Sequence, residues 1–316
     1  MLTIKDVFRK TAKILKDFRG MSSYGGVSLA LQGAIAKFRP PRRPAYYNKI
    51  AESLFQDFTL PVIRQYHINL DSLESSGSTY RNDGPIWVMW WQGVDESTPK
   101  IVRACIDSMK RHAHGREVII VDGQNYSRYV DLPSPISSRF QRGEITITAL
   151  SDYIRFALLY KFGGMWMDAT LYLTDDFPAD IQTLPVYTRH ENREPDKDRW
   201  IWAIYFIGGT PNNPLFYTLM KTYESYWEQR DQQVDYLMTD ILILGLYRNS
   251  NAVQHALEQV PFNNSRVFYL ATMMGESAQK SLEPHDDTYA HKLTYKFQPK
   301  GDASDTWFDQ VCEGRL

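Results

Sequence analysis

Cysteine is scarce in this chain, which has only Cys105 and Cys312 among its 316 residues. Two thiols so far apart in sequence form neither a disulfide framework nor a zinc site with ligand spacing, and they favour a reducing compartment. Long apolar runs are missing too. No segment approaches the roughly 18 residues that a membrane span needs, and the N-terminus lacks the apolar core of a secretory signal. We therefore expect a cytoplasmic protein without a spanning segment.

An excess of one charge is also missing, because the formal net charge is only -1. The near balance conceals an asymmetry: residues 1–50 contain 11 Lys and Arg against 2 Asp, a balance of +9, so the remainder carries -10. With 43% hydrophobic residues, the chain is large enough for one sizeable α/β domain with an appendage.

The basic N-terminal segment predicts an amphipathic helix. Apolar side chains recur on one side of it: Ile4, Val7, Phe8, Leu15 and Phe18. Basic side chains lie mostly around the other side: Arg9, Lys10, Lys13 and Lys16. Helices of this kind lie on anionic membranes, so one hypothesis is that residues 1–45 hold the protein peripherally on the inner membrane face. The other is that the helix packs on the main domain with its basic face in solvent.

The chain divides into two predicted parts. Residues 1–83 form a basic helical extension and linker, because the three prolines within 39–44 interrupt a helix. Residues 84–316 form the main domain.

An alternation of strands and helices is predicted within the main domain. The segments 86–91 and 118–121 are apolar runs typical of buried strands, and a helix is predicted between them at 99–111. This β-α-β order predicts a parallel sheet. Further strands are predicted at 200–207 and 291–297.

The most informative pattern runs from residue 151 to residue 170. Ser151 suits a helix N-cap, and apolar residues then recur at the three-to-four spacing of a buried helix face. Gly163 and Gly164 end that helix, and the apolar strand that follows ends on Asp168. A carboxylate at that point lies in the crevice where open α/β sheets bind ligands.

Two charged residues of the predicted helix, Asp152 and Arg155, are three apart and share one face. They are therefore able to converge with Asp168. The alternative is an ion pair on the helix surface, which would contribute only about 0.2 to 0.5 kcal/mol to helix stability.

The order Ser-Asp-x-x-Arg, helix, Gly-Gly and acidic strand end resembles the donor site of glycosyltransferases in the capsular polysaccharide synthesis family. The likeness covers residues 85–174 and implies an α/β fold of GT-A type: a Rossmann-like, mostly parallel sheet flanked by helices, here with an N-terminal helical extension. It implies three catalytic residues: Asp168, Asp152 and Arg155. It implies a donor-binding set: Trp90, Gln92, Ser151, Asp152, Arg155, Gly164 and Asp168.

Within that set, the likeness implies that Trp90 stacks on the nucleotide base and that Gln92 reads the edge of the base. The alternative for Trp90 is a core position. Side chains alternate along a strand, so the neighbouring tryptophans Trp87, Trp90 and Trp91 are unable to face one ligand together.

Many relatives carry an Asp-x-Asp motif, whereas this chain has Asp168-Ala169-Thr170. The resemblance implies a divalent cofactor, Mn2+ or Mg2+, bound by Asp168 and bridging the donor diphosphate. Thr170 is then expected to help complete the ligand shell, and His291 is a candidate late ligand. The alternative for His291 is a hydrogen-bonded strand residue.

The predicted activity is transfer of a sugar from a nucleotide donor, a UDP-sugar, to a surface-polysaccharide or lipid-linked glycan acceptor, with retention at the anomeric carbon. No nucleic-acid partner is expected. For an inverting enzyme, Asp235, Asp240 and Glu191 are candidate general bases. Two alternatives remain: a noncatalytic glycan-binding or assembly subunit with this fold, and a glycoside hydrolase, which has no need of a nucleotide pocket.

Overall fold

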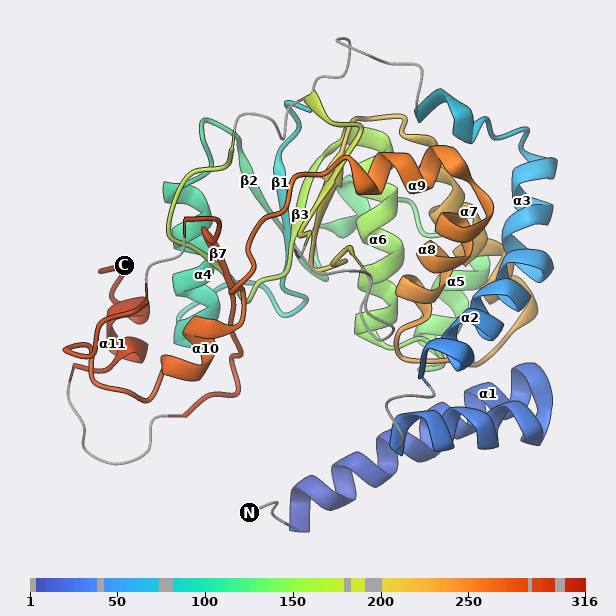
Figure 1. Ribbon diagram of the computed structural model, residues 1–316, viewed down its shortest axis with the longest axis horizontal. Helices are drawn as coiled ribbons and strands as arrows, with labels where there is room; N and C mark the ends of the chain where they lie inside the picture. Colours follow the sequence, from blue (N-terminus) through green and yellow to red (C-terminus); the bar gives the residue numbers. More distant parts are fainter. Residues whose placement is uncertain are drawn as a thin grey trace.

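The computed structural model describes residues 4–38, 43–73, 82–178, 183–190, 201–283, 286–298 and 305–316. A five-stranded sheet lies between two layers of helices (Figure 1). Its strand order is β2-β1-β3-β6-β5. The strands are β1 (Ile86–Met89), β2 (Val118–Val121), β3 (Gly164–Met167), β5 (Val186–Thr188) and β6 (Phe206–Gly209). A separate pair of strands is formed by β4 (Leu171–Leu173) and β7 (Ala290–Lys292).

Four of the five strands run in one direction. β1 pairs in parallel with β2 and with β3, and β6 runs antiparallel to both β3 and β5. The predicted α/β class and mostly parallel sheet are therefore confirmed. The strand expected at 200–207 begins later, as β6, and includes Gly208 and Gly209. A Cβ on Gly208 would collide with the carbonyl oxygen of Gly164, so glycine is needed for the close pairing of β6 with β3.

Helices cover both faces of the sheet (Figure 1). One layer contains α4 (Lys100–Arg111), α10 (Tyr269–Met273) and α11 (Trp307–Cys312). The other contains α5 (Ser134–Gln141), α6 (Ile147–Phe162), α7 (Pro214–Gln229), α8 (Met238–Asn249) and α9 (Asn251–Glu258). The central strands β1 and β3 are buried on both faces, which explains their continuous apolar sequences.

The N-terminal helix α1 (Ile4–Phe38) doubles back at Gly25 and Gly26 and forms a hairpin along one side of the molecule (Figure 1). Gly26 has φ of 76°, a conformation that glycine adopts readily. The following helices, α2 (Arg43–Leu54) and α3 (Leu60–Gln65), lie in the segment assigned above to the extension.

These two helices share the core of the main domain. Ile50 and Leu54 of α2 are fully buried, and α2 packs against α8. Most of the predicted proline linker, residues 39–42, lies outside the described residues. In the described part of the chain, no helix combines the length and apolarity needed to cross a bilayer.

Candidate functional site

Asp168 follows the last residue of β3. Because side chains alternate along a strand, Trp166 and Asp168 point toward the layer that contains α6, while Met165 and Met167 pack into the opposite core. The backbone N–H of Asp168 donates to the carbonyl of Tyr205 at 3.0 Å, just before β6. The predicted place of Asp168 at the exit of a buried strand is confirmed.

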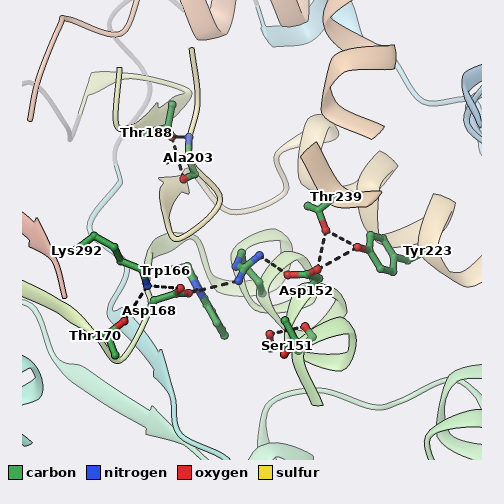
Figure 2. Close-up of polar contacts among 12 residues, drawn as sticks. Ser151, Asp152, Trp166, Asp168, Thr170, Thr188, Ala203, Tyr223, Thr239 and Lys292 are labelled. Atoms are coloured by element: carbon green, nitrogen blue, oxygen red, sulfur yellow. Dashed lines mark hydrogen bonds and ion pairs between the residues drawn. The ribbon is translucent and has the colours of Figure 1, made fainter. Parts of the chain in front are cut away.

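Cationic and N–H donors surround the Asp168 carboxylate. Its Oδ2 accepts from Nζ of Lys292 at 2.7 Å, and its Oδ1 accepts from Nε1 of Trp166 at 3.0 Å (Figure 2). Nη2 of Arg155 lies 3.6 Å from Oδ1. Burial alone raises the pKa of Asp168, but Lys292 and Arg155 outweigh burial and hold that pKa below its usual value. The carboxylate is therefore ionised at neutral pH, and 33% of its side chain remains exposed.

Lys292 comes from β7, 124 residues away from Asp168 in sequence. Its Nζ also donates to Oγ1 of Thr170 at 2.8 Å and lies 5.2 Å from the ring centre of Tyr205. We call Asp152, Arg155, Trp166, Asp168, Thr170 and Lys292 the strand-end cluster. Sequence reasoning missed Lys292, because only the pairing of β4 with β7 brings it to Asp168.

His291, the neighbour of Lys292, points to the other face of the β4–β7 pair, as alternation along β7 requires. Its Nε2 lies 3.3 Å from Oγ1 of Thr174, and its buried Nδ1 has no hydrogen-bond partner within the described residues. Burial lowers the pKa of His291 to about 4, so the ring is neutral. The structure does not bring His291 together with Asp168 as expected for a shared ion, because Lys292 takes that position.

Asp152 and Arg155 form a buried ion pair, with Oδ1 of Asp152 2.7 Å from Nη1 of Arg155. Oδ2 of Asp152 accepts from Thr239 Oγ1 at 2.8 Å and from the Tyr223 hydroxyl at 3.4 Å (Figure 2). The guanidinium of Arg155 also stacks 4.7 Å above the ring of Trp166. Arg155 is thus fixed between the two acids. Direct contact of Asp152 with a sugar-nucleotide donor stays a prediction. Its ion pair with Arg155 also lets Asp152 position that guanidinium.

Asp240, in the first turn of α8, is another buried acid near this pair. Burial, followed by the negative charge of Asp152, raises the pKa of Asp240 from its ordinary value near 3.8 to about 7. Of the other two candidate bases, Asp235 is buried and accepts from the N–H of Leu237 at 2.9 Å, and Glu191 lies outside the described residues.

The raised pKa of Asp240 predicts a pH dependence of stability. A group whose pKa is higher in the folded state than in the unfolded state binds more protons when the protein is folded. The contribution of Asp240 to the free energy of unfolding therefore falls as the pH rises through about 4 to 7. We expect the Asp240→Asn variant to lose that decline, measured as the free energy of unfolding in urea at a series of pH values. Asp71→Asn, at an exposed position, is the control. Parallel pH curves for the wild type and Asp240→Asn would contradict the assignment.

The predicted N-cap at Ser151 is wrong. The helix begins one turn earlier, and the side chain of Thr146 accepts from the N–H of Ala149 as its N-cap. The Ser151 hydroxyl instead donates to the carbonyl of Thr148 at 2.7 Å inside the helix. Ser151 as a donor contact stays a prediction.

Gly164 begins β3, whereas Asp168 follows the other end of the same strand. Its φ is 93°, and a Cβ there would collide with the carbonyl oxygen of Pro85. Gly164 is therefore required for close packing, and the structure does not bring it into the strand-end cluster.

The two predicted nucleotide contacts follow β1. Trp90 is half-buried, with its ring 5.5 Å from that of Tyr295 in an edge-on arrangement. Gln92 is exposed in the turn after it. Both follow the end of a strand that is parallel to β3, so they lie at the same edge of the sheet as Asp168. Their contacts with a nucleotide stay predictions.

A divalent cation does not fit the side chains around Asp168. Mg2+ or Mn2+ needs several oxygen ligands, and both carboxylate oxygens already face cations or N–H donors. Thr170, expected in the ligand shell, accepts from Lys292. The groups that contact Asp168 and Thr170 therefore form an ion-pair cluster rather than a metal centre.

One possible metal-binding group does exist among the described residues. Ligand atoms of His112, Asp175 and Asp176 lie within 4.8 Å of one another. His112 follows the C-terminal end of α4, and its Nδ1 lies 3.0 Å from Oδ1 of Asp176. This group is at the surface and contains no member of the strand-end cluster.

A surface pocket of about 350 Å3 lies on the opposite side of α6 from Asp152 and Arg155. Tyr153 and Tyr160 of α6 line it together with Lys221 of α7. Its lining contains no member of the strand-end cluster.

Comparison with known proteins gives three findings. Residues 44–311 match a family described as "Capsular polysaccharide synthesis protein". No curated protein matches the chain. Among solved structures, "PaToxG Glycosyltransferase" aligns with a TM-score of 0.41 and 16% sequence identity, covering 68% of this chain and 90% of that chain.

Proposed function

The chain belongs to the capsular polysaccharide synthesis protein family, and we propose that it is a glycosyltransferase of GT-A type. In this proposal it moves a sugar from a nucleotide donor, a UDP-sugar, to a surface-polysaccharide or lipid-linked glycan. The observation that carries the proposal is the ionised, partly exposed carboxylate of Asp168 between two fixed cations. It follows the carboxyl end of β3, and ligands of open α/β sheets bind at that edge.

The chemistry suits this cluster. Transfer breaks the bond between the anomeric carbon and the phosphate oxygen, and the electron pair stays with the diphosphate. The acceptor hydroxyl oxygen bonds to the anomeric carbon, and its proton passes to the departing diphosphate oxygen. The sugar gains positive charge on the way, which the carboxylate of Asp168 stabilises in a site of reduced dielectric. Arg155, whose side chain is only 4% exposed, contributes a fixed positive charge beside this carboxylate.

We expect retention at the anomeric carbon, as the donor-site resemblance implies, because attack on the face that the diphosphate leaves lets the departing oxygen take the acceptor proton. Proton NMR of the first product, recorded before its anomers equilibrate, should show the anomeric coupling constant of the same configuration as in the donor sugar. The opposite coupling would establish inversion and direct attention to Asp240 as a general base.

Nucleotide binding tests the proposal. UDP, GDP, ADP and CDP are each titrated into the wild-type protein by calorimetry, with Mn2+ and with EDTA, followed by the corresponding sugar nucleotides. We expect one base to bind selectively, with UDP as the first candidate. No binding of any nucleotide under either condition would remove the transferase proposal and favour the noncatalytic or the hydrolase alternative.

We also propose that the N-terminal hairpin docks on an anionic membrane surface. Three apolar side chains on the second arm of α1 share one face and are exposed: Val27 (60%), Leu31 (51%) and Ile35 (38%). The excess of +9 over residues 1–50 supplies the complementary charge.

Cosedimentation with vesicles tests the docking face. The wild type should sediment with phosphatidylcholine vesicles that contain phosphatidylglycerol, and Val27→Glu with Leu31→Glu should lower the bound fraction several-fold. The matched control is Ser28→Glu with Gln32→Glu, which adds the same charge at neighbouring exposed positions. Equal loss in both double variants would show that the apolar face does not insert. Absence of wild-type binding would favour the packing hypothesis.

A further inference from the structure

The site proposed above contains a lysine where the resemblance implied a metal. Nζ of Lys292 lies 2.7 Å from Oδ2 of Asp168 and 2.8 Å from Oγ1 of Thr170. It therefore bridges the first and third positions of Asp168-Ala169-Thr170, the segment at which the resemblance implied a metal site. A cation that bound both positions would lie where this ammonium lies.

The ammonium of Lys292 has capacity for a ligand. A lysine ammonium offers three N–H donors, and within the described residues Lys292 donates to two acceptors, Asp168 and Thr170. Its third N–H has no hydrogen-bond acceptor among the described residues, and 19% of the side chain is exposed. The neighbouring Asp168 side chain is 33% exposed, so an anion is able to approach the pair from solvent.

A second positive charge lies within the same cluster. Arg155 is held by Asp152 at 2.7 Å and reaches to 3.6 Å from Asp168. Both cations are fixed by protein contacts before any ligand arrives, and preorganised charges of this kind stabilise developing charge without reorganisation. Two fixed cations on opposite sides of one carboxylate also repel a further cation there.

We propose that Lys292, supported by the fixed charge of Arg155, binds the donor diphosphate and stabilises it as a leaving group in place of a divalent metal ion. This inference rests on the proposed function. As the bond between the anomeric carbon and the phosphate oxygen breaks, the electron pair and its negative charge remain on the diphosphate. Lys292 donates a hydrogen bond to that oxygen and keeps its proton, because the proton of the acceptor hydroxyl neutralises the departing group.

The test measures binding of UDP, or of the nucleoside diphosphate that proves selective, with EDTA and with Mn2+. The wild type should bind equally well under both conditions. Lys292→Met, which keeps much of the side-chain length without the charge, should bind about 10- to 100-fold more weakly, the range expected for a lost charge-assisted hydrogen bond. Lys292→Arg should recover part of the affinity. Lys296→Met, four residues further along at an exposed position, is the matched control and should bind as the wild type does.

The outcomes separate this inference from the proposed function. Wild-type binding that requires Mn2+ would overturn the role of Lys292 and leave the transferase proposal standing. Unchanged binding by a folded Lys292→Met variant in EDTA would overturn it as well. Failure of the wild type to bind any nucleotide with or without metal would overturn both. The comparison of EDTA with Mn2+ uses the wild type alone, so it tests the metal requirement even if Lys292→Met does not fold, and Lys292→Arg then tests the lysine.

Discussion

Replacing Asp168 by Asn is expected to lower kcat for sugar transfer by about 100- to 1000-fold, the range found when one preorganised electrostatic group is removed. The variant keeps the size of the side chain and removes the charge that lies between Lys292 and Arg155. Because a third of the Asp168 side chain is exposed, the fold should survive, and the circular dichroism spectrum should be unchanged. Asp168→Ala should abolish transfer for the same reason.

The kinetic effect of Asp168→Asn is compared with that of Asp107→Asn. Asp107 is an acid on α4 with 62% of its side chain exposed, and it lies outside both the strand-end cluster and the possible metal-binding group. Its variant should retain wild-type kcat. Full activity in Asp168→Asn would remove the proposed centre.

Replacing Asp152 by Ala is expected to cost about 3 to 5 kcal/mol in the free energy of unfolding, because it leaves the buried guanidinium of Arg155 without its close partner. The two side chains are only 6% and 4% exposed, so water does not replace the lost contact. Thr239 and Tyr223 lose an acceptor at the same time. Urea denaturation followed by fluorescence measures the change.

The matched control for this ion pair is Asp107→Ala. Asp107 and Lys110 are also three residues apart on a helix, with N and O atoms 3.7 Å apart, but their side chains are 62% and 54% exposed. Exposed pairs of this kind contribute about 0 to 1 kcal/mol. Adding Arg155→Met to Asp152→Ala should recover part of the lost stability, since the uncompensated charge is then gone. A loss below about 1 kcal/mol in Asp152→Ala would contradict the buried-pair account.

The elements that short-range sequence patterns specify were predictable. Continuous apolar runs predict β1, β2 and β3, and the double glycine at 163–164 predicts the break before β3. The position of Asp168 follows from these, because it is the first polar residue after the strand. The start of α6 was not predictable to within a turn, since Thr146 and Ser151 are both hydroxyl residues that suit an N-cap.

The cation beside Asp168 depends on long-range register, which the sequence does not specify locally. β7 pairs with β4 so that Lys292 is opposite Leu171 and His291 is opposite Tyr172. A shift of one residue would exchange the faces of Lys292 and His291. The sequence therefore predicted His291 as the residue near Asp168. The pairing of β4 with β7, two short strands far apart in the chain, places Lys292 there instead.

Turnover of a sugar nucleotide is the decisive test of the proposed transferase activity. The wild-type protein is incubated with UDP-glucose, UDP-galactose and UDP-N-acetylglucosamine, with octyl glycosides as simple acceptors, and the products are identified by chromatography and mass spectrometry. We expect release of UDP together with an acceptor that is heavier by one sugar residue. Nucleotide binding with neither transfer to an acceptor nor hydrolysis of the donor would contradict it, and would identify the chain as a noncatalytic member of the family.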